Sequence, residues 1–174
     1  MKSLAVWTGG ALLTLVAGTA LGQDESTNRV AVETAWNVFV EEDPQECWSV
    51  SAPVETLNTQ GGEEVDVLRG DIGMYVTYRP GSDVEGEVSF TGGYPFAEGS
   101  TVEVDVGGTE YEFFTEGEWA WPASAEADAE VIAALRQGSE AIVTAGSSRG
   151  TTTQDTFSLY GFTAALDEVQ SRCE

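Results

Sequence analysis

The chain carries few of the side chains that enzymes use near neutral pH. It has no histidine, and Lys2 is its only lysine. Without an imidazole the usual general base is missing, and Ser–Lys or Schiff-base chemistry would need a lysine in the mature chain. Any two of the 30 carboxylates could form a glycosidase-like pair, but no two stand out by their spacing. We therefore predict that the protein has no catalytic residues and is not an enzyme, with a small carboxylate-dependent hydrolase as the least favoured alternative.

Metal and cofactor sites also lack their usual sequence patterns. The chain has no EF-hand calcium loop, and a zinc site would lack imidazole ligands. The densest acidic cluster consists of Glu63, Glu64 and Asp66. Since such a run is typical of a solvated loop, we expect no metal site and no cofactor.

The first 22 residues have the features of a secretory signal peptide. Lys2 precedes an uncharged stretch over residues 3–21 that is rich in Leu, Ala and Val, and Ala20-Leu21-Gly22 offers small residues to a signal peptidase. Cleavage is expected before Gln23. Gly and Thr residues interrupt the stretch, so a membrane anchor is the weaker interpretation. We predict a signal peptide over 1–22, no membrane span in the mature chain, and a periplasmic or secreted protein.

The expected export bears on the state of the two cysteines. Cys47 and Cys173 are the only ones in the chain, and an even pair in an oxidising compartment indicates a disulfide. Two free thiols or a metal pair would be the alternative. The bridge would close a loop of 126 residues, which the chain-entropy model values at about 4–5 kcal/mol.

The mature chain is strongly acidic. Cleavage would leave 152 residues, with six Arg against 30 acidic residues and a net charge of −24. Such a protein repels nucleic acids and anionic membranes, so we expect neither as a partner. The acidity indicates either adaptation to a salty exterior or a cationic ligand. We expect the partner to be a protein or a component of the cell envelope.

Three short stretches could form a recognition site. Tyr94, Trp119 and Trp121 are the candidate binding surface, because aromatic residues are enriched at interfaces, although packing in the core is the alternative. Arg69-Gly70-Asp71 spells the tripeptide of integrin ligands, but its position between two strands favours a plain turn. The Ser147-Ser148-Arg149-Gly150 stretch could bind an anion and is read as a hairpin turn.

Alternating apolar and polar residues predict that strands carry these candidates. The expected strands cover residues 34–40, 46–51, 87–91, 101–106, 110–115, 119–121, 141–145 and 151–159, with one or two further strands over residues 65–67 and 72–78. Gly107 and Gly108 predict a tight hairpin, and residues 58–64 a polar loop.

Two helices are expected late in the chain. Ser124 can cap the first, in which Ala127, Val131 and Leu135 recur at intervals of four. The second follows Gly161 and places Phe162, Leu166, Val169 and Cys173 on one face. The pattern predicts a mostly β protein, a β-sandwich (immunoglobulin-like or jelly-roll-like) with two short helices in the C-terminal half. Residues 23–33 are expected to be a flexible lead and residues 34–174 a single domain.

Several motifs resemble the invasion-associated locus B family of exported bacterial proteins, best represented in alphaproteobacteria. The most specific run is Asp155-Thr156-Phe157-Ser158-Leu159-Tyr160-Gly161-Phe162 with Cys173 behind it. Further matching stretches are Cys47-Trp48, Arg69-Gly70, Tyr78-Arg79-Pro80, Gly93-Tyr94-Pro95, Arg136-Gln137-Gly138 and Ser148-Arg149-Gly150-Thr151.

The resemblance implies a periplasmic or surface-associated binding domain without enzymatic activity. Cys47 and Cys173 match the paired cysteines of the family, which supports the bridge. A founding member is linked to bacterial entry into host cells, so a role in host-cell interaction is one expectation. A structural or stress-related periplasmic protein without a host role is the alternative. The chain departs from the family in its acidity and its lack of Lys.

Overall fold

A computed structural model describes residues 28–173 of the protein, and the predicted signal peptide with its cleavage site lies outside them. The described residues form strands β1 (Arg29–Glu33), β2 (Trp36–Glu42), β3 (Gln45–Ser51), β4 (Glu55–Gln60), β5 (Glu63–Glu64), β6 (Gly73–Arg79), β7 (Val84–Thr91), β8 (Thr101–Val106), β9 (Thr109–Glu116), β10 (Trp119–Trp121), β11 (Glu140–Gly146) and β12 (Thr152–Ser158). They also form the 3-10 turn η1 (Pro80–Ser82) and helices α1 (Ala125–Gln137) and α2 (Phe162–Cys173).

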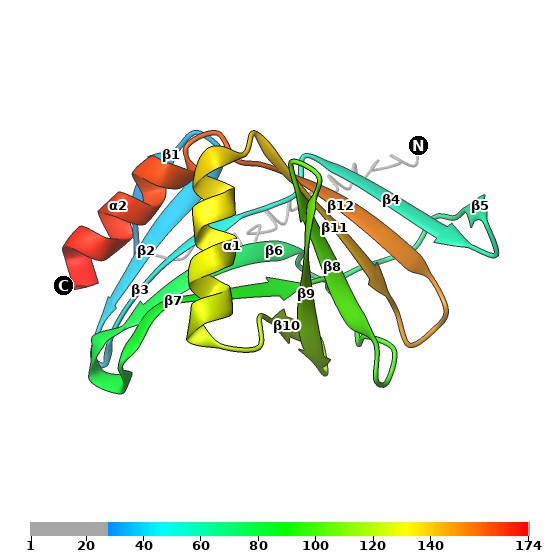
Figure 1. The fold of residues 1–174 in the computed structure, drawn as a ribbon, viewed down its shortest axis with the longest axis horizontal. Helices are drawn as coiled ribbons and strands as arrows, with labels where there is room; N and C mark the ends of the chain where they lie inside the picture. Colours follow the sequence, from blue (N-terminus) through cyan, green and yellow to red (C-terminus); the bar gives the residue numbers. More distant parts are fainter. Residues whose placement is uncertain (1–27, 174) are drawn as a thin grey trace, which may run out of the picture.

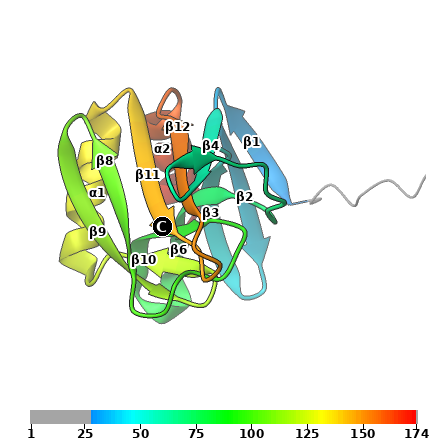
Figure 2. The same cartoon turned by 90° about the vertical axis from the view of Figure 1, so that its right-hand side faces the viewer.

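All of these strands belong to one antiparallel sheet, with the order β1-β2-β3-β6-β7-β10-β9-β8-β11-β12-β4-β5. The sheet bends so strongly that its two halves face each other (Figures 1 and 2). Phe90 of β7 meets Phe157 of β12 edge to face, with ring centroids 6.1 Å apart, although the two strands are not neighbours in the sheet. The expected mostly β fold with two helices in the C-terminal half is confirmed, as two layers of one continuous sheet around a shared core.

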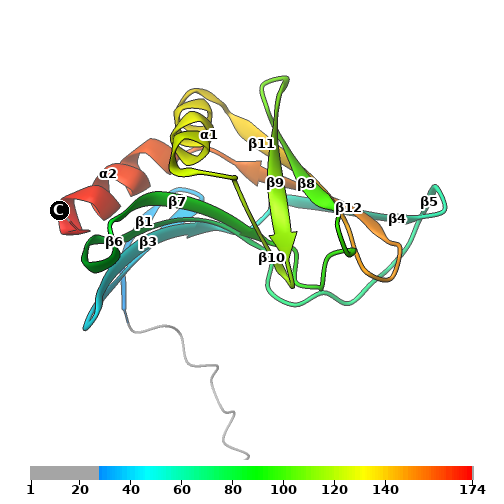
Figure 3. The ribbon, with the colours of Figure 1, turned by 60° about the horizontal axis from the view of Figure 1, so that its bottom comes forward.

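Both helices cover the inner face of the half-sheet that contains β1, β2, β3, β6 and β7, as Figure 3 shows. Ser124 accepts a hydrogen bond from the Ala127 amide at 3.3 Å, the cap expected for α1. The expected apolar face of α2 is buried, and its Phe162 packs against Trp36 with ring centroids 4.9 Å apart. The helices thus leave the opposite, outer face of this half-sheet open.

Three stretches differ from the sequence-based expectation. Residues 65–67, expected as a strand, lie in the loop between β5 and β6. Arg29–Glu33, expected within a flexible lead, form β1 and pair with β2 at the edge of the sheet. The expected loop over 58–64 contains the end of β4 and all of β5. The two missed strand segments are edge segments with mostly exposed side chains, so little apolar alternation marks them in the sequence.

A buried ion pair anchors the loop between β5 and β6. Arg69 makes two parallel hydrogen bonds to Asp155 of β12, Nη1 to Oδ1 at 2.7 Å and Nη2 to Oδ2 at 2.5 Å. Its Nε donates to the Gly92 carbonyl at 2.8 Å, and its guanidinium lies 5.1 Å from the ring centroid of Tyr94. The side chain of Arg69 is therefore buried and hydrogen-bonded inside the fold, and the Arg69-Gly70-Asp71 tripeptide cannot present it to a receptor.

Candidate functional site

Aromatic side chains gather on the outer face of the helix-covered half-sheet and the strands next to it. Strands β2, β3, β6, β10 and β9 alternate between inward residues of the core, such as Val38, Cys47 and Met74, and outward residues. The outward aromatic residues, which we call the aromatic face, are Phe39, Trp48, Tyr75, Phe114, Trp119 and Trp121.

The residues of the aromatic face form two groups. Phe39 and Trp48 are cross-strand partners and stack with centroids 5.4 Å apart. In the second group, Trp119 lies 5.4 Å from Tyr75 and 6.5 Å from Trp121, and Trp121 stacks on Phe114 at 5.5 Å. Trp119 and Phe114 retain 38% and 47% of their accessible surface, so this apolar area meets solvent.

A hollow of about 440 Å³, the aromatic hollow, lies between the two groups. Its aromatic lining consists of Trp48, Tyr75, Trp119 and Trp121, its small polar lining of Thr77 and Ser89, and its charged lining of Glu41, Glu46, Arg79 and Glu87. Thr77 and Ser89 are buried and short, whereas the aromatic and charged side chains around them are long. The hollow is therefore a slot in the sheet surface with aromatic walls.

Among the described residues, Arg79 is the one cation that lines the aromatic hollow, and two carboxylates bind it. Its Nε lies 2.9 Å from Glu46 and its Nη1 3.2 Å from Glu87. Burial acts to lower the pKa of Arg79, but the hydrogen bonds and charges of these two glutamates outweigh it and raise the pKa. Because Arg79 is neutralised in this way, the aromatic hollow stays net negative.

A second hollow of about 500 Å³, the acidic hollow, adjoins the first and shares Trp121 and Glu87 with it. It lies at the N-terminus of α1 and is lined by the carboxylates Asp83, Glu85, Glu87, Glu116 and Asp128, together with Phe114 and Trp121. The two hollows form one aromatic and strongly acidic surface.

Asp128 is the carboxyl whose protonation is most altered at this surface. Burial raises its pKa, the hydrogen bond from the Val88 amide at 2.8 Å lowers it, and the charge of Glu87 raises it, with a result of about 6. The same hydrogen bond joins α1 to β7. Asp128 thus has a structural task that accounts for its position.

The structure separates the three aromatic residues predicted as a binding surface. Trp119 and Trp121 lie on the aromatic face, whereas Tyr94 packs edge to face against Phe96, covers Arg69, and shares a 2.5 Å hydrogen bond with the Thr153 hydroxyl. Sequence reasoning missed Phe39, Trp48, Tyr75 and Phe114. Their signal was present, because each occupies an outward position in an alternating strand.

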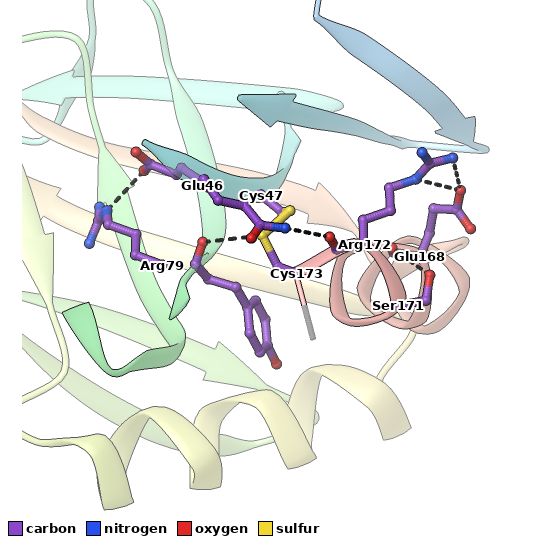
Figure 4. The surroundings of a disulfide bond; sticks show 9 residues. Glu46, Cys47, Arg79, Glu168, Ser171, Arg172 and Cys173 are labelled. Atoms are coloured by element: carbon purple, nitrogen blue, oxygen red, sulfur yellow. Dashed lines mark hydrogen bonds and ion pairs between the residues drawn. A yellow bond between two sulfur atoms is a disulfide. The ribbon is translucent and has the colours of Figure 1, made fainter. Parts of the chain in front are cut away.

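The disulfide starts from the inner side of β3, between Glu46 and Trp48, which line the aromatic hollow from the outer side. Figure 4 shows the bond and the neighbouring Glu46 and Arg79. Cys47 and Cys173 are bonded, with Sγ atoms 2.07 Å and Cα atoms 6.0 Å apart, which confirms the predicted bridge. The bond ties the end of α2 to the inner side of β3, and Gln45 adds a 2.9 Å hydrogen bond to the Arg172 carbonyl. On the outer side of the same strand, Glu46 reaches Arg79. The covalent link therefore helps to fix the backbone that carries one wall of the hollow.

Within residues 28–173, no helix is long and apolar enough to cross a membrane. In the same part of the chain, no three carboxylate or thiol side chains converge as a metal-binding group.

Comparisons with known proteins agree with the fold. The sequence profile of the Invasion associated locus B (IalB) protein family matches residues 41–170. A similar fold occurs in the crystal structure of invasion associated protein B from Bartonella henselae, with a TM-score of 0.55 and 16% sequence identity over 81% of this chain and 95% of that chain. A search of curated proteins gives no significant match. Since the family profile covers most of its length, the chain belongs to the invasion associated locus B family.

Proposed function

We propose that this protein is exported and acts by binding a partner, not by catalysis, and that the aromatic face is its binding surface. The observation that carries the proposal is the exposure of stacked aromatic residues beside two adjoining hollows. Exposed aromatic clusters of this kind are typical of recognition surfaces, since aromatic residues are enriched there and supply most of the contact energy.

Several features support export and the absence of catalysis. A disulfide persists in oxidising compartments, and residues 1–22 have the pattern of a signal peptide. The chain has no histidine, and the disulfide consumes both thiols. The family name refers to invasion, and contact with a host cell is one setting in which the face would act. A structural or stress-related role in the periplasm is the other.

The test is capture of partners from the cell envelope at native salt, with the wild-type protein and two variants as bait. Trp119→Ala/Trp121→Ala removes the centre of the aromatic face. Tyr160→Ala removes an aromatic residue that is 67% exposed elsewhere. We expect the specific partner to be lost with the first variant and kept with the second. Equal capture by all three proteins would refute the proposed surface, and mass spectrometry that finds residues 1–22 on the native protein would refute export by cleavage.

Asp128 supports a second candidate, a carboxylate-dependent hydrolase, because a carboxyl with a pKa of about 6 beside Glu87 has the form of a general acid. Asp128→Asn keeps the hydrogen-bond acceptor for the Val88 amide and removes the titration. If the wild type and the Asn variant capture the partner equally and neither cleaves it, binding is the function. If the wild type cleaves the captured partner and the Asn variant folds normally but does not cleave it, the hydrolase is favoured.

A further inference from the structure

We infer that the two adjoining hollows bind a basic peptide segment, one that presents at least two Arg or Lys side chains in extended conformation. The inference rests on the proposed function and names the chemistry of its partner. Three observations lead to it: the aromatic walls, the sign of the charge around them, and the division of the surface into two hollows.

The walls suit a cation that is also partly apolar. Trp48 stands on β3 and Trp121 on β10, three strand spacings apart in the sheet order, which is about 14 Å. Aromatic rings attract cations through their negative faces and bury the aliphatic stems of Arg and Lys. A guanidinium or ammonium group in the aromatic hollow would therefore contact ring faces while it approaches Glu41, Glu46 and Glu87.

The negative charge of the two hollows excludes two other occupants, an anionic ligand and a second copy of the chain. The one cation in the aromatic hollow, Arg79, is already paired with Glu46 and Glu87, and the acidic hollow is lined by five carboxylates. The whole chain carries a net charge of −23. An anionic ligand would be repelled, and so would a second copy of the chain, because it would bring the same charge.

The division into two hollows favours a chain over a small cation. The hollows measure about 440 and 500 Å³, lie side by side, and share Trp121 and Glu87. A single ammonium or guanidinium group fills only one of them. In an extended peptide, alternate side chains point to the same side. Two basic residues separated by one other residue can therefore enter both hollows at once.

The test is calorimetric titration of the native, disulfide-bonded protein at low salt with three probes. The first is a seven-residue capped peptide with Arg at positions 2, 4 and 6 between Ser and Thr. The second is the same peptide with citrulline, which keeps the shape of Arg without its charge. The third is spermine, a polyamine. We expect the Arg peptide to bind at least tenfold more tightly than the citrulline peptide and than spermine.

Two charge-matched variants separate the hollows from the overall charge. Glu41→Gln/Glu116→Gln removes one carboxylate from each hollow and leaves the Arg79 ion pairs intact. Glu63→Gln/Glu64→Gln removes two exposed carboxylates on β5, at the far end of the sheet. We expect the first variant to bind the Arg peptide about tenfold more weakly and the second to bind it within twofold of the wild type.

Four outcomes would overturn the inference: equal affinity for the Arg and citrulline peptides, spermine binding as tight as the peptide, equal losses in both charge variants, or no binding of the Arg peptide. Thermal unfolding checks that the variants fold.

Failure of the basic-peptide inference is distinct from failure of the proposed function. If the envelope partner is lost with Trp119→Ala/Trp121→Ala while the Arg peptide does not bind, the aromatic face is a binding surface for a different chemistry.

Discussion

Removal of one charge from the Arg69–Asp155 pair is expected to destabilise the fold severely. The side chain of Asp155 is fully buried and that of Arg69 is 6% exposed. Asp155→Asn keeps the shape of the side chain but turns an amide donor or a neutral oxygen toward a guanidinium that cannot deprotonate. An isolated charge left in a buried site costs about 3–5 kcal/mol. Because small domains have free energies of unfolding of about 5–15 kcal/mol, this change would remove a large share of the stability.

The measurement is denaturant unfolding at pH 7 with the disulfide intact, followed by tryptophan fluorescence. The matched control is Asp167→Asn, which breaks the Arg136–Asp167 pair, whose carboxylate side chain is 62% exposed. We expect that control to cost less than about 1 kcal/mol. The double variant Arg69→Met/Asp155→Leu should recover much of the loss, since it leaves no buried charge. A cost for Asp155→Asn as small as that of Asp167→Asn would refute the reasoning.

Three further predictions concern other parts of the fold. Reduction of the Cys47–Cys173 bond, which closes a loop of 126 residues, is expected to lower the free energy of unfolding by about 4–5 kcal/mol, and equal denaturation midpoints with and without reductant would contradict this. The pKa of Asp128 is raised to about 6 in the folded state, so its ionisation costs stability above that pH, and the cost disappears as the pH falls through 6 toward 4. Unfolding curves between pH 7 and 4 should show the wild type gaining stability relative to Asp128→Asn, and a constant difference would rule this out. Gly93→Ala should lower the free energy of unfolding by about 1–2 kcal/mol more than Gly99→Ala in the same denaturant measurement. Both glycines have φ near +70°, but only the Cβ at position 93 would meet a backbone oxygen, at 2.6 Å. Similar losses in the two variants would show that the close approach is unimportant.

Local patterns in the sequence were sufficient for most of the elements. The hairpin at Gly107 and Gly108, the cap at Ser124 and the buried face of α2 depend on neighbours within a few residues, and all three are present. The disulfide was predictable for a different reason, since a chain with a predicted signal peptide and two cysteines leaves a single pairing. The edge strand β1 was missed because its exposed side chains carry little alternation.

The candidate site was predictable only in part. The sequence pattern places Trp119 and Trp121 on one face of a strand, and the enrichment of aromatic residues at interfaces allowed them to be proposed as a surface. The pattern does not tell which strands become neighbours. Tyr94 has the same side-chain chemistry, yet its place between Arg69 and Thr153 could not be read from the residues around it.

The sequence by itself determined the acidity, the two faces of most strands, the helix ends and the single disulfide pairing, because each depends on composition or on short-range periodicity. The tertiary structure decided the sheet order. With it came the positions of Trp48 and Trp121 around one hollow and the pairing of Arg69 with Asp155, two residues that are 86 positions apart in the sequence. Strand pairing is a competition among all strands for hydrogen-bonded edges and buried area, so the partners of an outward aromatic residue depend on the whole chain.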